Sequence, residues 1–99
     1  MDGPLIKFHY HTAPKDVPHA NISKGDPLCH AYSDASIEEL IAWGRERGLP
    51  PEWIDRNHTL PHFDLHGRTL GYAGEGVERR ELVGDIRAWR ERAEGGGAE

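Results

Sequence analysis

Two segments of this chain, residues 5–11 and 60–66, alternate apolar and polar side chains at a period of two. This period is typical of a β-strand that buries one face, because successive side chains of a strand point to opposite sides. In the second segment Phe63 and Leu65 occupy apolar positions. The polar positions of both segments are rich in histidine, so the pattern predicts a sheet with one face in the core and a histidine-bearing face outside it.

Two further segments, residues 36–47 and 78–93, carry apolar residues at helical spacing. Ser36 followed by Glu39 fits a capping box at the start of the first helix, and Gly48 is placed to end it. The apolar stripe of the second helix consists of Leu82, Val83, Ile86 and Trp89. We therefore predict two amphipathic helices that each present one face for packing.

The order strand, helix, strand, helix predicts an α/β or α+β fold, in which a small sheet of two to three strands is covered on one face by the two amphipathic helices. Pro and Gly interrupt residues 12–30, which we expect to form a long connection. After a turn at Gly67, residues 68–72 are expected to add a third strand. We expect residues 1–94 to form a single small globular domain and residues 95–99 to form a disordered tail.

Charge and cysteine content narrow the class of protein. The 99 residues include 17 acidic and 12 basic side chains, a net charge of −5 with histidine neutral. General DNA binding is disfavoured, because it relies on clustered Lys and Arg, and no basic block is present. The single cysteine, Cys29, excludes an internal disulfide framework. No apolar run approaches the roughly 18 residues that span a bilayer and no signal peptide is visible, so we expect a cytoplasmic protein without a membrane partner.

The chain has seven histidines, and its densest set of candidate metal ligands consists of three polar side chains in the second predicted strand. At a period of two, His62, Asp64 and His66 project from one face together. Imidazole nitrogen and carboxylate oxygen are ligands that zinc, manganese and iron accept. The pattern therefore predicts a site for a divalent metal, although the same alternation also fits a solvated strand face.

Four motifs extend this hypothesis along the chain, and in order they are His30-Ala31-Tyr32-Ser33-Asp34, Gly48-Leu49-Pro50, His62-Phe63-Asp64-Leu65 and Arg80-Glu81-Leu82. Their order and spacing resemble an uncharacterised family of small bacterial and phage proteins of unknown function. Phe63 stands where that family usually has Tyr, and Ile41 where its helix often has His. The resemblance implies no activity, but it implies which polar residues matter, namely His30, Ser33, Asp34, His62 and Asp64.

The leading functional hypothesis is a metal site that hydrolyses a phosphoester or an amide. His62 and Asp64 would be ligands with His66 or His30 as the third, a set that leaves a position open for water. The metal would lower the pKa of that water to near ~7 and so make it a nucleophile. Asp34 would be a further ligand or a general base, but an acidic residue just before a helix also complements the helix N-terminus.

The alternative is a non-enzymatic module that binds a nucleotide, a peptide or a protein. Arg45 and Arg47, or Arg79 and Arg80, would clamp a phosphate in this case. The rings available for stacking on a base are Tyr32, Trp53 and Tyr72. The sequence does not identify the partner, and a small molecule and a nucleotide are both candidates.

A third hypothesis is a structural accessory protein that presents its tryptophans to a partner subunit. His9 and His11 form a His-x-His pair on the first predicted strand, and we expect them mainly to face water. Cys29 and His30 are adjacent, and adjacent residues of a strand point to opposite faces, so we do not expect them to form a catalytic pair. We expect Cys29 to be a small buried residue instead.

Overall fold

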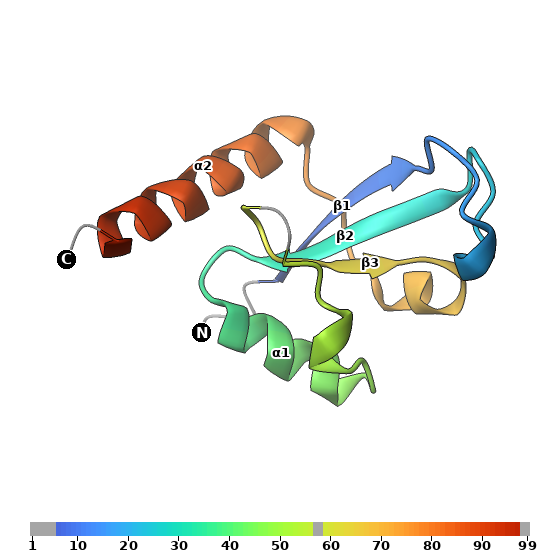
Figure 1. Ribbon diagram of the computed structural model, residues 1–99, viewed down its shortest axis with the longest axis horizontal. Helices are drawn as coiled ribbons and strands as arrows, with labels where there is room; N and C mark the ends of the chain where they lie inside the picture. Colours follow the sequence, from blue (N-terminus) through green and yellow to red (C-terminus); the bar gives the residue numbers. More distant parts are fainter. Residues whose placement is uncertain (1–5, 57–58, 98–99) are drawn as a thin grey trace.

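The computed structural model describes residues 6–56 and 59–97. In these ranges a three-stranded antiparallel sheet has the order β1-β2-β3, with β1 Ile6–Thr12, β2 Pro27–Ser33 and β3 Phe63–Leu65. The other elements are helices α1 Ile37–Glu46 and α2 Arg79–Gly97 and the 3-10 helices η1 Pro18–Ala20, η2 Pro51–Trp53 and η3 Gly67–Tyr72. The sheet lies between α1 and α2 (Figure 1). The predicted fold class, a small mixed α/β sheet with two helices, is confirmed.

The apolar face of the sheet packs against α1. Cys29 and Ala31 of β2 and Phe63 and Leu65 of β3 are buried on this face. The residues that cover them from α1 and the segments after it are Leu40, Trp43, Leu49 and Ile54. The period-two pattern therefore assigned the two apolar residues of β3 to the correct face.

Helix α1 approaches β3 closely through Gly44. A Cβ atom on Gly44 would lie 2.6 Å from Cζ of Phe63, so only glycine permits this packing without a shift. The start of α1 agrees with the sequence, because the side chain of Ser36 accepts a hydrogen bond from the N–H of Glu39. Gly48, just after the helix, has a φ of +77°, a left-handed conformation that glycine adopts without strain.

Strand β2 is where the structure differs most from the expectation. We expected residues 12–30 to form a connection, but residues 27–33 form the central strand and pair with both neighbours. Three successive residues, Ala31, Tyr32 and Ser33, are buried because both faces of the strand are covered at this end. A strand that is covered on both faces lacks the alternation by which strands are recognised.

Residues 68–72, which we expected to be a strand, belong to the 3-10 helix η3. The hydroxyl of Thr69 accepts a hydrogen bond from the N–H of His66 at 2.9 Å and donates one to the carbonyl oxygen of His66 at 2.7 Å. These local hydrogen bonds occupy the main-chain N–H and C=O groups of His66, just after β3. They take the place of the backbone hydrogen bonds that a hairpin strand would have formed.

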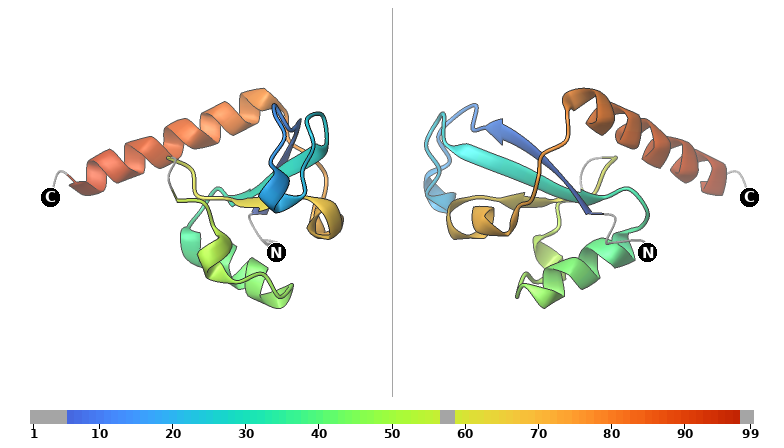
Figure 2. Two further views of the ribbon diagram at one scale, coloured as in Figure 1. Left: turned by 45° about the vertical axis from the view of Figure 1, so that its right-hand side comes forward. Right: turned by 180° about the vertical axis from the view of Figure 1, so that it is seen from behind.

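Helix α2 lies on the opposite side of the sheet from α1, whereas we expected both helices on one face (Figure 2). Nζ of Lys7 and the hydroxyl of Tyr32 donate hydrogen bonds to Asp85 of α2 at 3.0 and 2.7 Å. Nε1 of Trp89 donates to the carbonyl oxygen of Ser33 at 2.8 Å. Lys7 and Tyr32 are cross-strand partners on the polar face, so polar contacts hold α2 there.

Helix α2 has 19 residues and ends at Gly97. Many of its side chains are charged. Within the described ranges, no helix combines the length and the apolar character that crossing a membrane requires.

Candidate metal site

One face of the sheet carries a row of imidazoles. In the register of the sheet, His9 of β1 is opposite His30 of β2, and His30 is opposite Asp64 of β3. Opposite residues share a face of a sheet, so these three side chains project together. His11 joins them because it lies two residues after His9 in the same strand. This row lies on the face turned away from α1.

His62 reaches the same face from the residue before β3. Its main chain forms an antiparallel bridge with Asp55, in which the N–H of Asp55 donates at 2.8 Å and the N–H of His62 donates at 3.2 Å. The bridge keeps His62 in extended geometry, so His62 and Asp64 stay on one side of the strand. His62 is buried, with 7% of its surface exposed.

His30, His62 and Asp64 form a compact group, which we call the His/His/Asp group. Each residue offers one ligand atom, and the three atoms lie within 4.8 Å of one another. Nε2 of His30 and Nε2 of His62 are 3.3 and 3.4 Å from the same oxygen, Oδ1 of Asp64. The group could hold a metal ion, and no other group of this kind occurs among the described side chains.

The surroundings of His62 determine which of its nitrogens faces Asp64. Nδ1 lies 2.9 Å from the carbonyl oxygen of Leu60, and because a carbonyl only accepts, Nδ1 must carry a proton. Nε2 therefore faces the carboxylate, and such orientation of an imidazole by a second hydrogen bond is typical of metal-binding histidines. Burial lowers the pKa of His62, but its hydrogen bonds with Asp64 and Leu60 outweigh burial and raise the pKa overall.

The carboxylate of Asp64 is the electrostatic centre of the group. Burial raises its pKa, but hydrogen bonds with His30 and His62 outweigh burial and hold the pKa well below its usual range. A second carboxylate oxygen, Oδ2 of Asp55, lies 3.8 Å from Nε2 of His62. The surroundings therefore favour a positive charge between the imidazoles and the carboxylates, carried either by a proton or by a metal cation.

His9 and His11, which we expected mainly to face water, lie against this group. The ring centroid of His30 is 4.1 Å from that of His11 and 6.3 Å from that of His9. Burial lowers the pKa of both residues, and repulsion from His30 lowers it further. A lowered pKa favours the neutral form of both imidazoles, and the neutral form does not repel a cation from the site.

Two residues singled out by the sequence, Asp34 and His66, lie outside the His/His/Asp group. Oδ2 of Asp34 is 3.3 Å from Nζ of Lys7, in the ion-pair cluster that joins β1 to α2. The side chain of Ser33, and not that of Asp34, accepts the two backbone N–H groups that directly precede α1.

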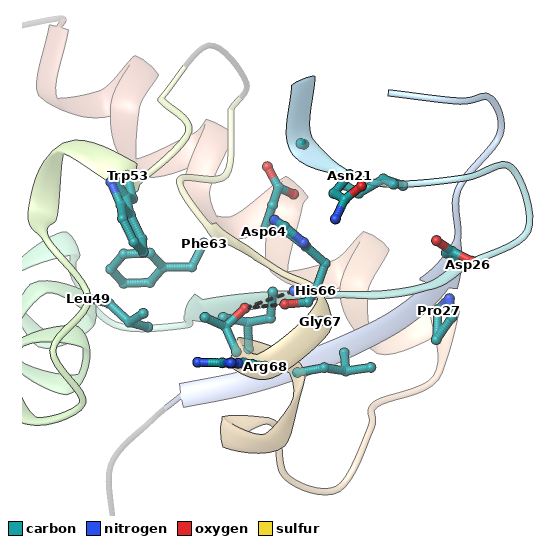
Figure 3. A pocket seen from close by; sticks show the side chains of 15 residues that line it. Asn21, Asp26, Pro27, Leu49, Trp53, Phe63, Asp64, His66, Gly67 and Arg68 are labelled. Carbon is teal, nitrogen blue, oxygen red and sulfur yellow. Dashed lines mark hydrogen bonds between the residues drawn. The ribbon is translucent and has the colours of Figure 1, made fainter. Parts of the chain in front are cut away.

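Two hollows border the site. A hollow of about 380 Å³ lies between the sheet and α2, and its lining residues are His30, Thr59, Leu60, His62, Leu82 and Ile86. A larger pocket of about 600 Å³ follows the outer side of β3, and Asp64 and His66 both line it (Figure 3). The His/His/Asp group thus borders one hollow through its imidazoles and the other through its carboxylate.

Asp55 and Lys7 belong to no local sequence motif that would indicate their contacts. Lys7 occupies a polar position in the alternation of β1, but its ion pairs with Asp34, Glu81 and Asp85 join segments far apart in the chain. Asp55 reaches His62 only because a backbone bridge brings the two residues together. Neither contact has a signature at short range in the sequence.

The fold and the site define a class of small mixed α/β proteins whose sheet carries a His/His/Asp group on the face away from α1. A family model described as "Protein of unknown function (DUF4031)" matches residues 16–88, and the chain belongs to this family. The match contains all three residues of the group, and the expected membership of an uncharacterised family is confirmed.

An uncharacterised protein of Bacillus subtilis (strain 168), YneQ, is 47% identical to this chain over 38 residues. The matched segment covers 38% of each of the two proteins. No solved structure matches the chain significantly.

Proposed function

We propose that this protein binds a divalent transition metal through His30, His62 and Asp64. Zinc is the first candidate for this metal, followed by manganese and iron. The observation that carries the proposal is the approach of two imidazole nitrogens to one carboxylate oxygen at 3.3 and 3.4 Å. Ligands about 2.1 Å from a tetrahedral ion lie about 3.4 Å apart, so these separations suit a shared ion. The proton on Nδ1 of His62 directs the lone pair of Nε2 towards such an ion.

We extend the proposal to hydrolysis of an amide or a phosphoester. Three protein ligands leave a tetrahedral ion one position for water, as in catalytic zinc sites. The water would give up a proton as its oxygen bonded to the carbonyl carbon or the phosphorus, the bond to the leaving group would break, and the leaving group would take up that proton. His66 is our candidate for a further ligand or a proton carrier, because it lines the same pocket as Asp64.

The geometry around Asp34 favours a structural role over the roles of ligand or general base that we predicted for it. Its carboxylate pairs with Lys7 beneath α2. We also propose a cytoplasmic location, which the single buried cysteine, Cys29, supports because disulfide frameworks are typical of secreted proteins of this size.

A non-enzymatic module that binds a small molecule or a nucleotide is the second candidate. Trp53 is 59% exposed and lines the larger pocket together with Arg68, a pair suited to stacking and to hydrogen bonding. Tyr32 is fully buried and is not available to stack on a base. The guanidinium of Arg47 lies over the ring of Trp43 at 4.5 Å, so it is engaged within the chain.

The metal content of protein purified without a histidine tag tests the first proposal. We expect about one equivalent of metal, removable by a chelator and restored by zinc. At a zinc concentration 100-fold above Kd the ion stabilises the fold by about 2.7 kcal/mol, which raises Tm by roughly 10–20 °C for a domain of this size.

The variants Asp64→Asn and His30→Ala should lose the metal and the shift in Tm. His19→Ala is the matched control, because His19 is exposed in η1 and outside the group. Uptake of neither zinc, manganese nor iron, with no change in Tm, would overturn the proposal. Hydrolysis is measured separately, with bis(p-nitrophenyl) phosphate and with peptide p-nitroanilides, on protein that carries the metal.

A further inference from the structure

The two outer edges of the sheet are covered to different extents. Along β1, Gly76 forms a parallel bridge with Phe8, and the N–H of Val77 donates to the carbonyl oxygen of Phe8 at 2.7 Å. Along β3, the bridge between Asp55 and His62 covers only the residue before the strand. The outer edge of β3 therefore stays uncovered by any strand or bridge in the described ranges, up to the turn that follows it.

Asp64 occupies the middle of this edge. In antiparallel sheets the main-chain N–H and C=O groups of alternate residues point to the same side. His62 directs both groups outward to Asp55, so Asp64, two residues later, also directs them away from β2. No group in residues 6–56 or 59–97 forms a hydrogen bond with either of them. The next outward N–H, that of His66, is already bonded to Thr69.

The larger pocket runs along this same edge. Figure 3 shows Trp53 and Leu49 towards one end of it, Asn21 and Asp26 towards the other, and Asp64 between them. Trp53 is 59% exposed, and a large aromatic side chain left open in a pocket is typical of a binding surface. The pocket thus offers an apolar end, a polar end and two main-chain hydrogen-bonding groups in its middle.

The charges of the residues that line this pocket favour a peptide over a nucleotide as its ligand. Among the described residues that line it, the acidic ones are Asp26 and Asp64 and the one arginine or lysine is Arg68. When no ion is bound to Asp64, a phosphate would meet more negative than positive charge here, which weighs against the nucleotide that Trp53 and Arg68 would otherwise suit. An extended peptide with no net negative charge fits these charges, and its main chain complements the open N–H and C=O of Asp64.

We propose that this pocket binds an extended peptide, one residue of which pairs with the main chain of Asp64 as an added strand. Strand geometry would place the side chain opposite Asp64 on the histidine-bearing face and the two flanking side chains towards the apolar face. One flanking side chain would then pack on Trp53, so an apolar residue is expected at that position. That the peptide is also the substrate rests on the proposed metal site, because Asp64 would hold the ion through its side chain while its main chain binds the peptide.

The probe is a positional-scanning library of N-acetylated, C-amidated hexapeptides, with binding measured by surface plasmon resonance on the full chain. The best hexapeptide is then tested against Asp64→Pro and Asp64→Ala. Both variants lack the carboxylate, so their difference isolates the main-chain N–H, and proline is tolerated where an edge N–H faces outward. We expect Asp64→Pro to bind roughly three- to tenfold more weakly than Asp64→Ala, the effect of one hydrogen bond.

Trp53→Ala should weaken binding by about tenfold, and N-methylation of one peptide amide should do the same as the proline substitution. Should Asp64→Pro fail to fold, the N-methylated peptides decide the question. Equal binding by the two Asp64 variants and by all N-methylated peptides, or no hexapeptide that binds, overturns the inference. The metal proposal is decided by a separate outcome. If the protein takes up no metal, but the chelator-treated protein still binds the peptide through its main chain, the metal proposal is wrong and the peptide proposal stands.

Discussion

The imidazole of His30 and the carboxylate of Asp64 face each other across β2 and β3, with Nε2 of one 3.3 Å from Oδ1 of the other. They are direct partners in the register of the two strands. A shift of that register by one residue would move Asp64 to the apolar face, so the register decides whether the site exists. The apolar pair Phe63 and Leu65 holds the register, because both side chains are buried on the other face.

Asp55→Asn is expected to weaken zinc binding by about tenfold, as substitutions next to metal ligands commonly do. The carboxylate of Asp55 lies 3.8 Å from Nε2 of His62, and asparagine keeps its shape while removing its charge. Affinity is measured by competition with a chromophoric chelator. Glu52→Gln serves as the control, since it removes the same charge from an exposed position nearby. Equal losses in the two variants would show that net charge alone matters.

Lys7→Met is expected to lower the free energy of unfolding by about 1–3 kcal/mol, less than for a fully buried pair. Lys7 is partly buried and lies within 4.0 Å of three carboxylates, those of Asp34, Glu81 and Asp85, which the substitution leaves without their cation. Urea denaturation measures the loss, and faster hydrogen exchange in α2 would locate it. Lys24→Met, at an exposed site, should change stability little. A variant that keeps full protection in α2 would contradict the role of Lys7.

Gly44→Ala and Gly84→Ala are expected to change stability in opposite directions. A methyl group at position 44 would lie 2.6 Å from the ring of Phe63, and such overpacking costs roughly 1–3 kcal/mol. At position 84 the added carbon would meet no atom within 4 Å beyond its chain neighbours and the adjacent backbone of α2, so alanine should stabilise α2 by up to about 1 kcal/mol. Thermal unfolding of the two variants is the measurement. Stabilisation by both would mean that α1 and β3 are further apart than the structure indicates.

Cys29 is expected to resist alkylation in the folded protein. Burial raises the pKa of its thiol to about 11, although a backbone hydrogen bond with His9 acts in the opposite direction. The reactive thiolate is therefore scarce between pH 7 and 9, and the sulfur is fully buried. Mass spectrometry after iodoacetamide should show modification only when urea is present. Rapid labelling in native buffer at pH 8 would refute this prediction.

Part of the site could be predicted from local pattern. The alternation around Asp64 placed His62 beside it, and the family resemblance added His30. Asp34 and His66 were predicted on the same grounds, but the chain turns immediately after β3 through Thr69, and Asp34 pairs with Lys7. Short-range spacing does not distinguish a strand that continues from one that ends.

By itself, the sequence determined the elements whose signals lie between near neighbours: the alternation of β1 and β3, the capped start of α1, and the apolar stripe of α2. These patterns are set by backbone geometry over a few residues. Only the tertiary structure decided that residues 27–33 form the central strand, that α2 crosses the histidine-bearing face, and that His9 and His11 lie beside His30. Such contacts depend on strand register and on packing between distant segments, which no local spacing encodes.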